Sequence, residues 1–211
     1  MNLQVYSMAY PVTSLGPGRR IVLWVSGCTK TCDGCISPEM RDPSAGKAVP
    51  VSALRRRMLE LDPSIDGVTI SGGEPFDQAP ALAELLETVR ADRPNWNVLV
   101  YSGYTLHDIS QVAGRAALLP FVDVVIDGPY MKDMPATHPL AGSSNQVIHY
   151  LSARASTLKC AMDACTTQQL NLGIGSGSFD MLIGIVQDSL RERVHEALNE
   201  PPRDADGPGG L

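Results

Sequence analysis

The sequence lacks any long run of apolar residues. Its densest run, Ile21–Val25, is far too short to cross a bilayer, which takes about 20 apolar residues. The N-terminal stretch also lacks a basic start followed by a long apolar core, so we expect no signal peptide. These absences predict a cytoplasmic protein without a membrane partner, in a compartment where thiols stay reduced.

An excess of positive charge is lacking as well. The 211 residues carry a formal net charge of −6, which argues against a broad nucleic-acid-binding surface. No segment repeats at a fixed period. Hydrophobic residues make up 44% of the chain, enough for a packed core, and the length fits one domain with an additional segment.

Apolar strands alternate with helical segments over the first 152 residues. Strands are expected at 19–27, 67–71, 97–102, 122–126 and 146–151. Helices are expected at 52–61, at 79–91, and from Thr105, whose hydroxyl can cap the first turn. This alternation predicts an α/β fold with a mostly parallel sheet covered on both faces.

Three of the five cysteines fall in one short run, at Cys28, Cys32 and Cys35. A zinc site or a cubane iron–sulfur cluster usually needs four ligands. The run therefore predicts either a cluster with one open corner, or a zinc site whose fourth ligand is distant, such as His107 or His138. Two glycines accompany the cysteine run. Gly27, just before Cys28, lets the chain turn into the loop, and Gly34, between Cys32 and Cys35, lets the backbone pass close to a ligand.

A second motif, SGGEP, follows the strand at 67–71. Ligands of parallel α/β folds sit at the carboxyl ends of the strands, where Gly72 and Gly73 would expose backbone polar groups. The Glu74 carboxylate could pair with a cationic amine. The alternative is an ordinary turn that leads into a helix.

Together the two motifs resemble the radical S-adenosylmethionine superfamily. Within that superfamily, the chain resembles the activating proteins of anaerobic ribonucleotide reductases more specifically. The resemblance rests on an ordered set of segments and covers residues 1 to about 152. These segments are GPGRRIVLWVSGC (16–28), CDGC (32–35), SGGEP (71–75), VYSGYTLHDI (100–109), VDVVIDGPY (122–130) and GSSNQVIHYL (142–151).

The resemblance implies an oxidoreductase built on a partial (β/α) barrel of mostly parallel strands. It implies one 4Fe-4S cluster with an open iron, which passes an electron into bound S-adenosylmethionine. The resulting 5′-deoxyadenosyl radical would take a hydrogen atom from a glycine of a partner glycyl radical enzyme, of the anaerobic ribonucleotide reductase type. A one-electron donor such as a flavodoxin is a further implied partner.

The resemblance also assigns residues to these roles. Cys28, Cys32 and Cys35 would ligate the cluster. Gly34 and Ile36 would line S-adenosylmethionine, and Gly72, Gly73 and Glu74 would contact its methionyl amine. Ser102, Asp127 and Asn145 would contact the ribose, adenosyl or methionyl parts, with strand-end caps or turn residues as the alternative for these last three.

The segment after residue 152 has no counterpart in the resemblance. We expect a core at 1–152, an extension at 153–199 with a hairpin at 170–185 and a helix at 186–198, and a disordered tail at 200–211. Cys160 and Cys165 are interpreted as a buried pair or incidental thiols, with an auxiliary cluster or a redox pair as alternatives. His149 is expected to serve packing.

Two other functions stay open at this point. The first is a radical S-adenosylmethionine enzyme that modifies a small metabolite or a peptide, because added segments near a barrel mouth shape the substrate site. The second is a non-catalytic zinc-binding module.

Overall fold

The computed structural model describes residues 1–62, 64–175, 178–185 and 193–194. Its main sheet has seven strands in the order β3-β1-β2-β4-β5-β6-β7. The strands are β1 (Asn2–Val12), β2 (Arg20–Val25), β3 (Lys47–Pro50), β4 (Gly67–Gly72), β5 (Asn97–Tyr101), β6 (Val124–Asp127) and β7 (Val147–Tyr150). The predicted helix at 186–198, apart from residues 193–194, and the predicted disordered tail lie outside the described residues.

The centre of the sheet is parallel, as the sequence predicts. β2 pairs with β4, β4 with β5, and β5 with β6 in parallel register, while β1, β3 and β7 join in antiparallel register. The sequence pattern predicts neither β1 nor β3. Polar residues and Pro11 interrupt β1, so that strand does not appear as one apolar run.

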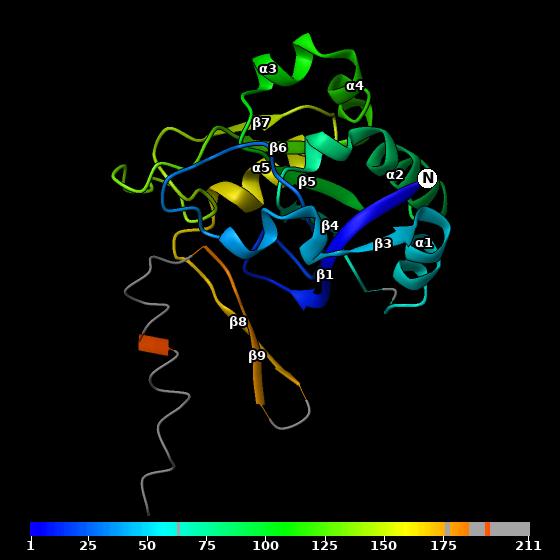
Figure 1. The fold of residues 1–211 in the computed structure, drawn as a ribbon, viewed down its shortest axis with the longest axis horizontal. Helices are drawn as coiled ribbons and strands as arrows, with labels where there is room; N and C mark the ends of the chain where they lie inside the picture. Colours follow the sequence, from blue (N-terminus) through cyan, green and yellow to red (C-terminus); the bar gives the residue numbers. More distant parts are fainter. Residues whose placement is uncertain (63, 176–177, 186–192, 195–211) are drawn as a thin grey trace, which may run out of the picture.

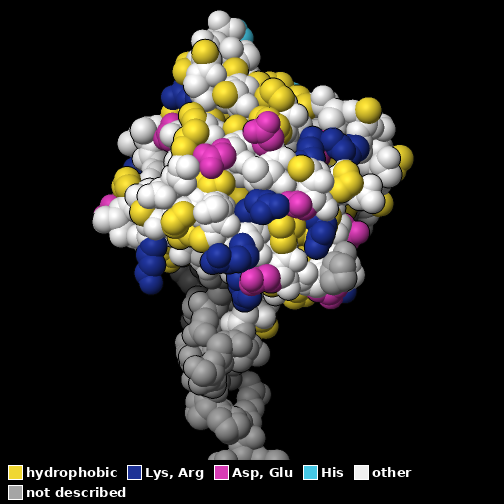
Figure 2. All heavy atoms as spheres, turned by 90° about the vertical axis from the view of Figure 1, so that its right-hand side faces the viewer, with side chains coloured by type: hydrophobic (Ala, Val, Ile, Leu, Met, Phe, Trp, Pro, Cys, Tyr) yellow, Lys and Arg dark blue, Asp and Glu magenta, His cyan; other side chains and the backbone are white. Residues whose placement is uncertain are grey.

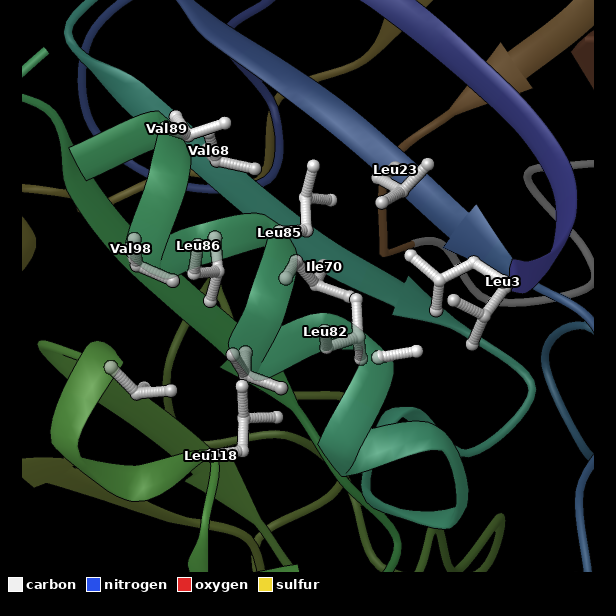
Figure 3. Close-up of a cluster of buried hydrophobic side chains, with 14 of the residues drawn as sticks. Leu3, Leu23, Val68, Ile70, Leu82, Leu85, Leu86, Val89, Val98 and Leu118 are labelled. Atoms are coloured by element: carbon white, nitrogen blue, oxygen red, sulfur yellow. The ribbon is translucent and has the colours of Figure 1, made fainter. Parts of the chain in front are cut away.

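Helices cover one face of the sheet. They are α1 (Val51–Leu59), α2 (Ala79–Asp92), α3 (Leu106–Gln111) and α4 (Ala113–Ala116), joined by 3-10 turns η1 (Pro38–Met40), η2 (Pro43–Ala45), η3 (Pro75–Gln78) and η4 (Leu119–Phe121). Figure 3 shows the leucines of α2 packed on the strands, with Leu82 and Leu85 beside Ile70. Thr105 caps α3 in a capping box, as predicted.

The C-terminal segment packs on the opposite face of the sheet. Side chains alternate along each strand, so Val98 and Val100 face the helices above while Leu99 faces the other way. There, Leu99 packs in one cluster with Leu158 and Met162 of α5 (Ala155–Asp163), a helix that the sequence pattern does not predict. The predicted hairpin is present as β8 (Asn171–Gly175) and β9 (Ser178–Ile183), which extend away from the body in Figure 1.

The surface over α1, α2 and the N-terminus mixes both signs of charge. Figure 2 shows Lys and Arg side chains there, interspersed with Asp, Glu and hydrophobic side chains. On this side, Arg55 pairs with Asp92 and the N-terminal amine pairs with Glu84. Within the described ranges, none of the helices is both long and apolar enough to span a bilayer.

One buried carboxylate connects the sheet, α2 and the start of the C-terminal segment. Asp123 is fully buried and accepts hydrogen bonds from the Val98 N–H and the Arg90 guanidinium, both at 2.8 Å, and from the Ser152 hydroxyl. Its backbone carbonyl accepts a further bond from the Leu151 N–H at 2.8 Å. Asp123 therefore holds the chain in place where it leaves β7.

We expect Asp123→Ala to lower the free energy of unfolding by about 3 kcal/mol or more, because it strands a half-buried guanidinium and a buried N–H. Urea denaturation followed by circular dichroism measures the change. Asp163→Ala is the matched control, because its i,i+4 pair with Lys159 is exposed. Equal stability of the two variants would contradict this account of Asp123.

Candidate functional site

A cavity of about 390 Å³ lies at the carboxyl edge of the parallel strands. The loop after β2 supplies the three clustered cysteines, the end of β4 supplies the glycine–glutamate motif, and β5 and β6 supply Ser102, Gly103 and Gly128. Ligands of parallel sheets bind at this edge because the loops that follow the strands converge there. The two motifs singled out in the sequence therefore share one cavity.

The cysteine loop is held by its backbone. The Gly27 N–H bonds to the Met40 carbonyl at 2.9 Å, and the Cys28 N–H bonds to the Arg41 carbonyl at 3.0 Å. Cys28, Cys32 and Cys35 all line the cavity as free, partly buried thiols. Burial raises the pKa of the Cys28 thiol, so its thiolate needs a compensating cation.

The donor set suits an iron–sulfur cluster better than a single ion. In the described part of the chain, no three His, Cys, Asp or Glu side chains converge tightly enough to hold one metal ion. A cubane cluster accepts thiolates that are further apart, because each thiolate binds a different iron. His107 and His138, considered above as a fourth zinc ligand, do not line the cavity. The His138 Nε2 atom lies 3.3 Å from the Met162 carbonyl oxygen, and its Nδ1 atom accepts from the Leu140 N–H at 3.1 Å.

Two glycines bring the SGGEP motif into contact with the cysteine loop. The Gly73 N–H bonds to the Val25 carbonyl and the Glu74 N–H bonds to the Gly27 carbonyl, both at 2.8 Å. A Cβ atom on Gly72 would lie 2.4 Å from the Val25 oxygen, and one on Gly73 would lie 2.1 Å from the Gly27 oxygen. Only glycine permits this approach, so the two glycines have a packing role besides lining the cavity.

Glu74 is a buried carboxylate with three donors. Its side chain, in a residue only 1% exposed, accepts bonds from the Phe76 N–H at 3.0 Å, the Ser102 hydroxyl at 2.9 Å and the Gly103 N–H at 2.8 Å. Burial nevertheless raises the pKa of Glu74 to about 7. The site thus holds a carboxyl group poised to ionise near neutrality, and Ser102 positions it.

Not every candidate residue lies on the cavity. Ile36 lines it, but Gly34 lies beside the Lys132 side chain, and neither Asp127 nor Asn145 is on the wall. The Asp127 carboxylate accepts from the Leu106 N–H at the start of α3. The Asn145 side chain donates to the Pro129 carbonyl at 2.8 Å.

His149, expected only to pack, contacts the Asp127 carboxylate through Nε2 at 3.0 Å. The alternatives considered for these residues, a strand-end cap and a turn residue, fit their observed positions, because Asp127 ends β6 and Asn145 lies in the turn before β7. Their predicted contacts with a cofactor stay predictions.

The cavity wall also includes residues that the sequence motifs do not predict, among them the polar and charged Gln146, Lys30 and Arg41. Gln146, next to Asn145, accepts from the Gly142 N–H at 2.7 Å and donates to the Gly128 carbonyl at 3.0 Å. Lys30 and Arg41 bring positive charge to the cavity, and the Lys30 ammonium lies 4.2 Å from the centre of the Tyr104 ring. No spacing rule distinguishes these side chains from surface residues in the sequence.

We expect Gly73→Ala to lower the free energy of unfolding by about 2 kcal/mol or more, because the new methyl group collides with backbone. Thermal or urea unfolding measures this. The control is Gly114→Ala on α4, where a Cβ meets nothing within 4 Å and the helix should gain up to about 1 kcal/mol. A stable Gly73→Ala variant would show that the SGGEP motif does not pack tightly against the backbone of Val25 and Gly27.

Comparison with known proteins places the chain in a family. Residues 14–149 match the family described as "4Fe-4S single cluster domain". The anaerobic ribonucleoside-triphosphate reductase-activating protein of Enterobacteria phage T4 is 32% identical over 145 residues, covering 67% of this chain and 90% of that protein. The protein of the same name from Vibrio cholerae is 33% identical over 152 residues, covering 68% and 96%.

The corresponding protein of Escherichia coli K12 is 29% identical over 153 residues, covering 69% of this chain and 98% of its own. The relatives are thus covered almost completely, whereas about a third of this chain lies outside the aligned part. The chain therefore belongs to the 4Fe-4S single cluster domain family, in the group that includes the anaerobic ribonucleoside-triphosphate reductase-activating proteins.

Proposed function

We propose that this chain is a radical S-adenosylmethionine activase that generates a glycyl radical on a partner anaerobic ribonucleotide reductase. The observation that carries the proposal is the shared cavity of Cys28, Cys32, Cys35 and the Gly72–Glu74 motif. When bound, the cluster would supply one electron that splits S-adenosylmethionine into methionine and the 5′-deoxyadenosyl radical. The relatives' names support the choice of partner.

The three cysteines would hold three irons of the 4Fe-4S cluster and leave the fourth iron open to S-adenosylmethionine. The mixed sheet, with its cavity at the carboxyl edge, fits a partial barrel of the radical S-adenosylmethionine type. Free thiols and an oxygen-sensitive cluster suit the reducing cytoplasm, where a flavodoxin-like donor could supply the electron.

The chain's own groups would orient the methionyl end of the cofactor. Glu74 offers a carboxylate to the cationic amine, and Ser102 and Gly103 keep that carboxylate in position. Ile36 adds an apolar contact on the cavity wall. It packs close to Gly142, because a Cβ atom added to Gly142 would lie only 3.0 Å from the Ile36 side chain. Glu74 and Ser102 are buried, which keeps water away from this carboxylate.

The choice of a glycine as the second substrate follows from the resemblance to the activating proteins of anaerobic ribonucleotide reductases, which the relatives' names support. A radical S-adenosylmethionine enzyme that modifies a small metabolite or a peptide is the second candidate, favoured by the residues Leu182–Ile185 on the cavity wall.

A non-catalytic zinc-binding module is not supported. Such a module needs ligands gathered around one ion, which the described residues do not provide. It would also leave Glu74 buried, with three donors and no ligand, although burying a carboxylate is costly.

We expect Cys32→Ala to lose the brown colour of the anaerobically prepared protein and all formation of 5′-deoxyadenosine with dithionite and S-adenosylmethionine. Iron analysis and chromatography measure both. Cys160→Ala is the control, because Cys160 is exposed and does not line the cavity, and it should retain both properties. Loss of iron from the Cys160 variant would contradict a single cluster.

Electron spin resonance on the partner reductase separates the two enzymatic candidates. An activase should produce a doublet glycyl signal on the reductase that requires S-adenosylmethionine. Deoxyadenosine that forms only after a small metabolite is added would favour the second candidate instead.

The raised pKa of Glu74 predicts a pH-dependent affinity for S-adenosylmethionine. Below pH 7 the carboxyl group is mostly protonated and cannot pair with an amine, so affinity should rise about fivefold from pH 6 to pH 7. Anaerobic calorimetry should show proton release on binding near pH 6.5. Glu74→Gln should remove both the affinity and its pH dependence, whereas the surface variant Glu84→Gln should retain them; a flat profile in the unmodified protein would refute this role.

A further inference from the structure

The C-terminal segment forms one wall of the cavity. Leu182, Ile183, Gly184 and Ile185 line it, and they lie beyond the family-matched residues 14–149. We call residues 182–185 the C-terminal wall. Ile183 and Ile185 pack in one cluster with Leu15, Trp24 and Met40, which also line the cavity. The cavity therefore has a thiol and carboxylate half and an apolar half.

The C-terminal wall is fixed to the body by specific contacts. The side-chain oxygen Oδ1 of Asn171, at the start of β8, accepts from the Thr13 and Ser14 N–H groups, both at 2.9 Å. The Ser14 hydroxyl donates to the Ile183 carbonyl at 2.9 Å in a buried bond. Ile183 is only 5% exposed and packs in one cluster with Trp24. These contacts join positions about 160 residues apart, so the wall is a built part of the site.

Two side chains of the wall keep surface available for a ligand. Leu182 and Ile185 are partly exposed and line the cavity, whereas Ile183 is used for docking. A reacting glycine offers no side chain to recognise, so selection of the right glycine must rely on its neighbours in the peptide. An apolar neighbour would bury its surface against this half of the cavity.

Resting on the proposed function, we infer that the C-terminal wall determines specificity: Leu182 and Ile185 contact an apolar side chain next to the reacting glycine of the partner reductase. The wall is continuous with the cavity that the glycine must enter. It acts in binding and takes no part in cleavage of S-adenosylmethionine.

The test varies the concentration of the full-length reductase and follows glycyl radical formation by electron spin resonance. Leu182→Ala and Ile185→Ala should each raise KM for the reductase about tenfold, as loss of an apolar contact does, with kcat retained. Leu172→Ala is the matched control. Leu172 lies opposite Leu182 in the hairpin, is 48% exposed and is absent from the cavity wall, so KM should not change.

Asn171→Ala tests the attachment of the wall without an activity assay. In a Trp96→Phe background, loosening of the wall should increase acrylamide quenching of Trp24, which is buried beside Ile183 in the intact chain. Unchanged quenching would overturn the attachment by Asn171.

The outcomes separate this inference from the proposal beneath it. Unmodified protein that forms no deoxyadenosine overturns the proposed function and this inference together. Normal deoxyadenosine formation, with KM unchanged in both wall variants or raised equally in Leu172→Ala, overturns this inference alone.

Discussion

The site depends on a direct backbone crossing between the ends of two neighbouring parallel strands. Where β2 and β4 end, Gly73 and Glu74 donate their N–H groups to carbonyls of Val25 and Gly27. No side chain fits between these segments. The crossing sets the cysteine loop and the Glu74 carboxylate on the same cavity, so the chemistry of both motifs depends on a contact in which no side chain takes part.

The carboxylate at this crossing illustrates how burial and hydrogen bonding oppose each other. Three donors favour the ionised form of Glu74, yet desolvation outweighs them and its pKa stays near 7. A group in this condition gains most from a cationic partner, because pairing restores what burial removed. The same logic applies to the partly buried Cys28 thiol, whose pKa is raised until a cation compensates its charge.

Much of the parallel core and the location of the two motifs could be predicted from sequence. β2, β4, β5 and β6 appear as short Val- and Ile-rich runs because both of their faces are covered. β1 could not be predicted because its side chains alternate in burial and include polar residues. α5 could not be predicted because its apolar stripe is only two turns long and consists of Ala155, Leu158 and Met162. The carboxyl ends of β2, β4, β5 and β6 lie within two residues of the predicted positions, but the direction of a side chain at a strand end is set by tertiary contacts. The Asp127 carboxylate accepts from the Leu106 N–H, the first of α3, and no local sequence pattern predicts this contact.

The buried position of Asp123 also bears on how the chain folds as a unit. Through Leu151 and Ser152 it ties the chain just beyond the family-matched residues 14–149 to β5 and α2, and α5 then covers Leu99, Val124 and Ile126. A chain cut after this junction would bare an apolar sheet face and invite aggregation. The segment beyond the family-matched residues is thus part of one cooperative folding unit with the sheet, through its contacts with Leu99, Val124 and Ile126.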